Sequence, residues 1–277
     1  MDIKFPKISI VTPSYNQAKF LEETIQSVID QRYPNLEYII IDGGSSDGSQ
    51  YIIRKYESYL TYWESQRDSG QSCAINKGFR KATGEIISYL NSDDRYCSNA
   101  LLSVAKYFLE HPECMWLCGN ILFTNERGKI FARKKPIYTP FILRFGSSSI
   151  YQPNVFVRRR ILSEVGFLRE DFHAIMDREW FCRISEVYRP HIIDVDIALF
   201  RWHSASKSCA EGKSFHKRRY FEERVLITKR YLPGLNSIID SFPRFFIFSL
   251  EQIARGVKLW KRIVLVFNRI IRRTNDE

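Results

Sequence analysis

Apolar runs alternate with helical patterns along the chain up to Pro112. Four runs are rich in isoleucine, valine and tyrosine, as in strands buried within a parallel sheet. They cover Lys7–Pro13, Tyr38–Ile41, Tyr62–Glu64 and Ile86–Leu90. After each run, apolar residues recur at helical spacing, and Leu21, Ile25, Val28 and Ile29 are the first such set. Because parallel strands need crossover helices, the pattern predicts β-α-β units in an open α/β sheet.

Polar turns follow the four predicted strands. They are Thr12–Asn16, Asp42–Asp47, Asp68–Gln71 and Asn91–Asp94. In open α/β sheets, ligands bind beyond the carboxyl ends of the strands, so we expect these turns to share one edge. The last turn carries two carboxylates, and hard oxygen ligands suit Mg²⁺ or Mn²⁺ bound together with substrate phosphates. Taken alone, the turn fits a helix cap equally well.

The second half of the chain predicts a mixed pattern. Hairpin strands are expected at Trp116–Phe123 and Lys129–Ala132, a strand at Gln152–Val157, helices at Arg158–Val165 and Met176–Glu186, and strands at His191–Ile193 and Ala198–Trp202. A glycine-rich loop over Gly43–Ser49 lacks both the Gly-x-Gly-x-x-Gly spacing and the lysine of a P-loop. It therefore supports neither a dinucleotide fingerprint nor an ATPase.

Composition fits a globular protein, with 277 residues, of which 44% are hydrophobic and 26% charged. The six cysteines show no paired metal-site spacing, which favours reduced thiols in the cytosol. We recognise neither a signal peptide nor an apolar run of about 18 residues. These features predict a cytoplasmic protein, with a first domain over residues 1–211 and a basic, helical tail over 212–277.

The tail carries most of the net charge of +11. From Gly212 to Glu277 there are 15 Lys+Arg and 6 Asp+Glu, so 15 − 6 = +9. One apolar stripe recurs at spacings of four and three: Phe246, Leu250, Ile253, Val257, Trp260, Val264, Phe267 and Ile271. An amphipathic helix with a basic far side is typical of attachment to an anionic membrane surface. Packing on its own domain or on a second copy, giving a homodimer, is the alternative, whereas nucleic acid is not expected because no base-reading motif accompanies the charge.

Six segments, in order, resemble family 2 of the inverting glycosyltransferases, which have the GT-A fold. They are Ile8–Asn16, Ile39–Ser49, Arg67–Asp94, Gln152–Arg159, Met176–Ile184 and Arg201–Ser208. Each is weak alone, but together they span about the first three quarters of the chain. The resemblance implies a GT-A fold, that is, a Rossmann-like open mixed sheet with helices on both faces, here followed by C-terminal amphipathic helices.

The resemblance also implies roles for individual residues. Those expected to bind the nucleotide and donor sugar are Thr12, Pro13, Ser14, Tyr15, Asp42, Asp68, Asn76, Asn91 and Ser92. Asn91-Ser92-Asp93 occupies the Asp-x-Asp position of the family, which makes Asp93 the expected ligand of Mn²⁺ or Mg²⁺. Asn91 departs from that motif and weakens the metal inference. His203 is expected to complete the metal shell or to contact the diphosphate.

Asp177, within Met176–Trp180, matches the catalytic base of the family, which would deprotonate the acceptor hydroxyl. Glu179 is its nearest rival and Asp171 a more distant one. Residues that could contact the acceptor or form a lid are Asp94, Glu179, Ser206 and Lys207.

The predicted activity is transfer of one sugar from a nucleotide sugar to a glycan or polyprenyl-linked acceptor, at the inner face of the membrane, in cell-surface polysaccharide biosynthesis. A UDP-hexose or UDP-N-acetylhexosamine is the favoured donor. A processive synthase is disfavoured, because its Gln-x-x-Arg-Trp motif is missing. Two alternatives are a non-catalytic sugar-nucleotide-binding protein of this fold and a nucleotidyltransferase, whose glycine-rich N-terminal signature Ile8–Asn16 lacks.

Overall fold

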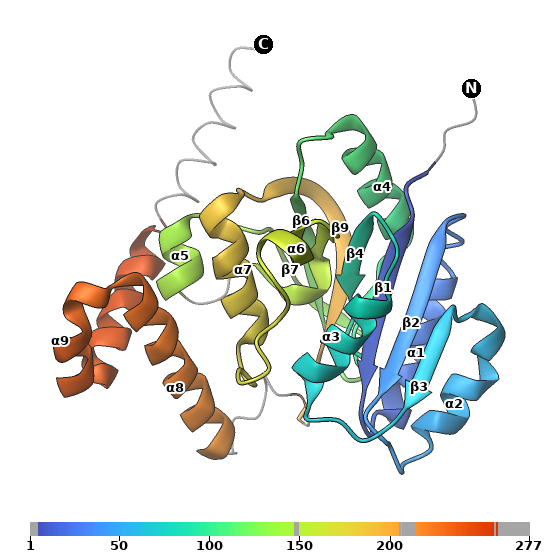
Figure 1. The fold of residues 1–277 in the computed structure, drawn as a ribbon, viewed down its shortest axis with the longest axis horizontal. Coiled ribbons are helices and arrows are strands. Elements are labelled where there is room, and N and C mark those ends of the chain that lie inside the picture. Colours follow the sequence, from blue (N-terminus) through green and yellow to red (C-terminus); the bar gives the residue numbers. More distant parts are fainter. Residues whose placement is uncertain (1–4, 147–149, 205, 207–213, 258, 260–277) are drawn as a thin grey trace.

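A computed structural model describes residues 5–146, 150–204, 206, 214–257 and 259 (Figure 1). These residues form a nine-stranded mixed sheet in the order β3-β2-β1-β4-β8-β6-β9-β5, with β7 paired to β6. The strands are β1 (Ile8–Ser14), β2 (Leu36–Asp42), β3 (Tyr62–Ser65), β4 (Ile86–Tyr89), β5 (Arg95–Tyr96), β6 (Trp116–Asn125), β7 (Ile130–Lys134), β8 (Val155–Arg158) and β9 (His191–Trp202).

Helices lie on both faces of this sheet. They are α1 (Ala18–Ile29), α2 (Ser49–Lys55), α3 (Gln71–Lys81), α4 (Ala100–Glu110), α5 (Pro140–Phe145), α6 (Ile161–Glu164), α7 (Met176–Val187), α8 (Ser214–Tyr231) and α9 (Asn236–Ser241). Residues 243–257 are also helical. Short 3-10 turns occupy Glu57–Tyr59, Gln152–Asn154 and Pro233–Leu235.

The first half confirms the predicted α/β pattern. Strand β1 pairs in parallel with β2 and β4, and β2 pairs in parallel with β3. The register places Ser14 opposite Asp42, so both strands end at the same edge. The arrowheads of β1, β2 and β3 point to one edge in Figure 1. All four predicted polar turns therefore begin at this carboxyl edge.

The second half makes the sheet mixed, and two predicted strands differ there. Strand β8 runs antiparallel to β4 and β6, whereas β9 runs parallel to β6. The sequence predicted two strands here, because Asp194 and Asp196 interrupt the apolar pattern. In the structure they form one continuous strand, β9. Those carboxylates lie in the strand and pair with Arg133. The strand predicted from Gln152 starts only at Val155, after a 3-10 turn that contains Pro153.

Two hydrophobic cores lie on the two faces. One joins the sheet to α1, α2 and α4, and the other joins it to α3, α5, α6 and α7. The second core also includes Ile227 of α8, which is 3% exposed. The first helix of the tail therefore shares a core with residues of the body. The predicted division at residues 211 and 212 stays a prediction.

The helix over residues 243–257 also contacts the body. Ala254 packs against Gly146 at the end of α5, and Glu251 pairs with Arg224 of α8 at 3.0 Å. Of the predicted stripe, Phe246, Leu250 and Val257 are half-buried, whereas Ile253 is exposed. The stripe's remaining residues (Trp260, Val264, Phe267 and Ile271) lie outside the described residues. None of the helices in the described ranges is long and apolar enough to span a lipid bilayer.

Candidate active site

The loop after β2 is held by Asp42, whose carboxylate is fully buried. It accepts hydrogen bonds from the backbone N–H groups of Gly44 and Ser45, at 3.1 and 2.8 Å, and from the hydroxyls of Ser45 and Ser65, at 2.5 and 2.6 Å. These four donors use most of the acceptor capacity of the two oxygens. Asp42 thus shapes the loop between β2 and α2, at the edge where the sequence analysis placed the nucleotide.

Beside this loop, Tyr15, Gly43 and Asp68 lie together. A Cβ atom at Gly43 would lie 3.3 Å from Tyr15 Cδ2 and 3.3 Å from Asp68 Oδ2. The backbone of Gly43 thus fits between an aromatic ring and a carboxylate. Tyr15 is 63% exposed, and Asp68 is partly exposed and accepts a hydrogen bond from the N–H of Gly70 at 2.8 Å. A planar base could stack here with a hydrogen-bond acceptor beside it.

At the end of β1, the side chains of Thr12 and Pro13 are buried, so this segment contributes mainly backbone groups to the candidate site. Thr12 is buried, and its hydroxyl lies 3.1 Å from that of Tyr38, inside the core. Pro13 is also buried. The hydroxyl of Ser14 is buried and has no hydrogen-bond partner among the described residues, and its carbonyl accepts from the N–H of Gly43 at 2.8 Å.

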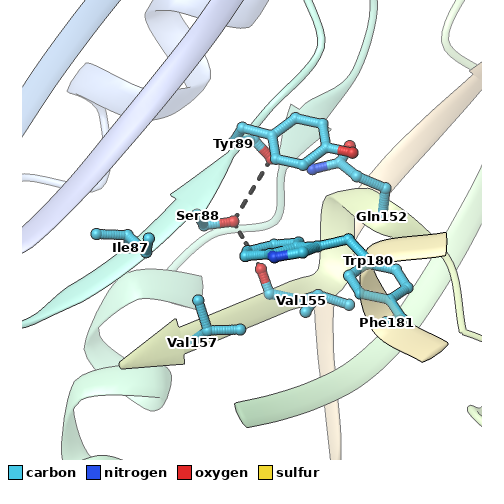
Figure 2. A pocket seen from close by; sticks show the side chains of 8 residues that line it. All are labelled: Ile87, Ser88, Tyr89, Gln152, Val155, Val157, Trp180 and Phe181. Carbon is cyan, nitrogen blue, oxygen red and sulfur yellow. Dashed lines mark hydrogen bonds between the residues drawn. The ribbon is translucent and has the colours of Figure 1, made fainter. Parts of the chain in front are cut away.

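Three amides link the end of β4 to its neighbours. Asn91 Oδ1 accepts from Gln71 Nε2 at 2.7 Å, and Asn91 Nδ2 lies 3.3 Å from Gln152 Oε1. Gln152 donates in turn to the carbonyl of Tyr89, beside a small pocket at this strand end (Figure 2). Ser92 is buried within the turn. Both glutamines lie in segments that carried the family resemblance, but we predicted no role for either from the sequence.

Asp93 and His203 meet at this edge, with Asp93 Oδ2 and His203 Nε2 2.9 Å apart. His203 is 4% exposed and packs against Phe20, with ring centroids 4.6 Å apart. The guanidinium of buried Arg201 donates to the carbonyl of Asp93 at 3.1 Å. A carboxylate oxygen and an imidazole nitrogen at this separation could both bind one divalent cation, and both ligand types suit Mn²⁺. The donor set therefore fits the predicted metal and leaves further positions for substrate oxygens.

Of the residues predicted to contact the acceptor or form a lid, Ser206 and Lys207 follow β9. Ser206 donates its N–H and its hydroxyl to the carbonyl of His203, at 3.1 and 2.9 Å, and so closes the turn after β9. Lys207 lies outside the described residues.

Asp94 faces inward, with 1% of its surface exposed. Its carboxylate accepts the N–H of Arg201 at 2.9 Å, and its carbonyl accepts the hydroxyl of Thr24 at 2.8 Å. Burial, together with the charge of Asp93, raises its pKa well above the ordinary value. The side chain of Asp94 therefore ties the turn to β9 and its backbone carbonyl ties it to α1, and the carboxylate does not lie at the surface.

Asp177 occupies the first turn of α7 and is partly exposed. Removal of water around the carboxyl raises its pKa, and the N–H of Arg178, at 2.8 Å, opposes that shift. Burial also raises the pKa of Tyr89, with contributions from the charges of Asp177 and Asp94. Asp177 therefore lies within electrostatic range of the end of β4. Asp94, in the turn that also carries Asp93, acts on the same tyrosine hydroxyl.

Glu223 of α8 holds the loop that leads into α7. Its buried carboxylate accepts the N–H groups of His173, Ala174 and Ile175, at 2.7, 2.9 and 2.9 Å. These groups immediately precede Asp177. We did not predict a role for Glu223 from the sequence, since a contact across 48–50 positions leaves no local pattern.

Three other candidates are engaged elsewhere. Glu179 is buried and pairs with Arg183 at 2.9 Å. The amide of Asn76 bonds the backbone of Leu168, donating at 2.9 Å and accepting at 3.1 Å. Asp171 pairs with Arg169 at the surface. The structure does not bring these three side chains to the Asp93–His203 pair.

Comparison with known proteins agrees with this architecture. Residues 9–182 match the family described as Glycosyl transferase family 2. The chain is 27% identical over 224 residues to TuaG of Bacillus subtilis, which is named a teichuronic acid biosynthesis glycosyltransferase, covering 73% of this chain and 86% of that one. It is 29% identical over 194 residues to the O-antigen biosynthesis protein RfbC of Myxococcus xanthus, covering 65% of this chain but 14% of that one.

Solved structures share the fold at low sequence identity. TarS of S. aureus superposes with a TM-score of 0.62 at 20% identity, covering 82% of this chain and 40% of TarS. The mannosyltransferase PcManGT of Pyrobaculum calidifontis, solved with GDP-Man and Mn²⁺, gives a TM-score of 0.61 at 17% identity, covering 97% and 81% of the two chains. The α/β architecture is thus that of GT-A glycosyltransferases, as predicted. With its family motifs on that fold, the chain belongs to Glycosyl transferase family 2.

Proposed function

We propose that this chain is an inverting, metal-dependent glycosyltransferase that moves one sugar from a nucleotide sugar to a glycan or polyprenyl-linked acceptor. The observation that carries the proposal is the pairing of Asp93 with His203, 2.9 Å apart, in the segments that follow β4 and β9. The effect of the Asp177 charge on Tyr89, at the end of β4, supports a base nearby. TuaG and RfbC are both named for polysaccharide biosynthesis, which supports the same process for this chain.

The donor end of the reaction falls to residues at the ends of β1 to β4. Tyr15 would stack on the base, Asp68 would accept from its N–H groups, and the loop held by Asp42 would contact the ribose. A UDP-sugar is the favoured donor, in line with the UDP-GlcNAc complex of TarS. Asp93 and His203 would hold Mn²⁺ or Mg²⁺, which when bound neutralises the charge that develops on the departing diphosphate.

The acceptor end falls to Asp177. Removal of water around the carboxyl raises its pKa, which makes the carboxylate a better proton acceptor than an exposed aspartate. Attack by the acceptor oxygen on the anomeric carbon, opposite the departing diphosphate, inverts that carbon in one displacement. One base suffices for such a step, so no covalent intermediate on the protein is required.

A panel of nucleotide sugars tests the donor assignment. A bound donor raises the melting temperature by mass action, and the shift should be larger with Mn²⁺ than with EDTA. UDP release in the presence of an acceptor extract then separates an enzyme from a non-catalytic sugar-nucleotide-binding protein, which would show the shift without release.

We also propose that the tail attaches the protein to the cytoplasmic face of an anionic membrane. The helix over residues 243–257 exposes Phe245 and Phe248 by 73% and 59%, next to Phe242 at 65%, and the tail carries a charge of +9. Apolar side chains beside basic ones are what an in-plane helix requires. Placement at this face would bring the site to a lipid-linked acceptor.

Flotation with phosphatidylglycerol liposomes tests this attachment on the full chain, because truncation would remove Ile227 from the core. The double variant Phe245→Ser, Phe248→Ser should float markedly less than wild type. Tyr51→Ser, which removes a 75% exposed side chain on α2, should float normally. Equal flotation of all three proteins would contradict the attachment and favour packing on a second copy.

A further inference from the structure

A second group of metal-ligating side chains lies away from the candidate active site. It consists of His111, just after α4, Glu113 in the following turn, and His191 at the start of β9. One ligand atom from each lies within 4.8 Å of the others. His111 Nδ1 and Glu113 Oε1 are 3.2 Å apart. Three ligands thus converge from segments that are far apart in the sequence.

The topology separates this cluster from the Asp93–His203 pair. Strands β6 and β9 run parallel to each other, and Leu117 pairs with His191 where both begin. Since β8 is antiparallel to both β4 and β6, β6 begins at the edge opposite to the one where β4 ends. In Figure 1, α4 lies at the opposite side of the sheet from the arrowheads of β1 and β2.

Tyr107 orients both imidazoles. Its hydroxyl lies 3.1 Å from His191 Nδ1, and its ring stacks on that of His111, with centroids 4.2 Å apart and planes at 29°. A hydrogen bond to one ring nitrogen fixes the tautomer and orientation with which the other can bind a metal. The cluster therefore has support around its ligands as well as the ligands themselves.

We propose that His111, Glu113 and His191 bind one Zn²⁺ ion. Two imidazoles and one carboxylate are a common protein ligand set for zinc, with a fourth position left for water. Zinc–ligand bonds of about 2.1 Å place neighbouring tetrahedral ligands roughly 3.4 Å apart, close to the separation of His111 and Glu113. The partial exposure of His111, at 39%, and of Glu113, at 64%, gives an ion access from solvent. Bound zinc would connect the end of α4 to the start of β9 and so stabilise this edge of the sheet.

Calorimetric titration of the metal-free full chain with Zn²⁺ tests the proposal. We expect one zinc site per chain to survive Asp93→Asn and that site to be lost in His111→Asn. Glu113→Gln should weaken binding by about tenfold or more, whereas Glu110→Gln, a neighbouring exposed carboxylate, should not. Tyr107→Phe, which keeps the ring but removes the hydroxyl, should weaken it by roughly 10-fold to 100-fold.

The thermal shift gives a second readout. Zinc should still raise the melting temperature of Asp93→Asn, and should raise that of Glu113→Gln by less than that of wild type. Glu113→Gln is a surface change compatible with folding. Unchanged zinc affinity in both His111→Asn and Glu113→Gln would overturn the proposal, as would a zinc site that disappears with Asp93→Asn alone.

Discussion

Glu223→Gln should impair catalysis from a residue in the tail. The carboxylate accepts three backbone N–H groups, from His173 to Ile175, immediately before Asp177. Glutamine keeps one acceptor oxygen, but its NH₂ group would face the backbone N–H groups that bond the other oxygen of Glu223. One charge-assisted hydrogen bond would be lost and the others weakened, at a cost of about 2–4 kcal/mol. Calorimetric or fluorescence-monitored melting should show a fall of roughly 3–7 °C for a chain of this size.

The kinetic consequence distinguishes positioning from general destabilisation. A shift of about 1 Å in a catalytic group costs on the order of 10²-fold in rate, so kcat should fall while the Kd for UDP stays unchanged. The charge of Glu223 also contributes to raising the pKa of Asp177. Its removal should therefore lower that pKa and move the acid limb of the pH–rate profile to lower pH.

A matched control lies one residue away. Glu222 of α8 pairs with Arg218 at the surface, and its side chain is 48% exposed. Glu222→Gln removes the same charge and should change stability by less than about 0.5 kcal/mol. If Glu223→Gln transferred sugar at the rate of Glu222→Gln, with the same pH profile, the positioning argument would be refuted.

Three further predictions concern stability and the metal pair. Burial alone would raise the pKa of Glu37, but hydrogen bonds from Lys7, Ser9 and Thr83 lower it to about 2, below the ordinary 4.5. The ionised carboxylate of Glu37 thus stabilises the fold above pH 4.5, and this contribution is lost as the pH falls towards 2. In denaturant titrations, the free energy of unfolding of Glu37→Gln should depend on pH over this range by about 3 kcal/mol less than that of wild type. Gly78→Ala should lower the free energy of unfolding by about 1–3 kcal/mol in the same assay, because its Cβ would lie 2.3 Å from a methyl group of β1. Gly256→Ala should raise it by about 0.5–1 kcal/mol, because nothing lies within 4 Å of the added Cβ. Arg201→Lys should weaken Mn²⁺-dependent UDP binding, because only the guanidinium of arginine reaches the carbonyls of both Asp93 and Glu126. Calorimetry measures this binding, and an affinity equal to that of wild type would contradict the prediction.

Local patterns predicted the parallel half of the sheet well. The runs that end at Asp42 and at Asn91 are mostly apolar and stop abruptly, so their burial and their common edge followed from the sequence. Strand β9 was harder, because Asp194 and Asp196 resemble a break in the pattern until the arginine that pairs with them is known. Arg133 lies 61 and 63 positions from Asp194 and Asp196, so no single window of sequence contains this pairing.

Side-chain orientation was the part of the site that the sequence could not supply. Asn76 lies in a matching segment, yet its amide is used to hold Leu168. Asn91 departs from the family motif, and its amide donates towards Gln152, which an aspartate could not do. A carboxylate there would also add charge beside Asp94, whose pKa is already raised. The departure thus has a local electrostatic reason.

The central claim divides the work between Asp93, which holds the metal and diphosphate, and Asp177, which takes the proton. The most direct test measures UDP binding with Mn²⁺ by calorimetry and sugar transfer by UDP release in the same two variants. Asp93→Ala should lose the Mn²⁺-dependent part of binding, whereas Asp177→Asn should bind as wild type and transfer on the order of 10²-fold or more slowly. Near-normal transfer by Asp177→Asn would contradict the account.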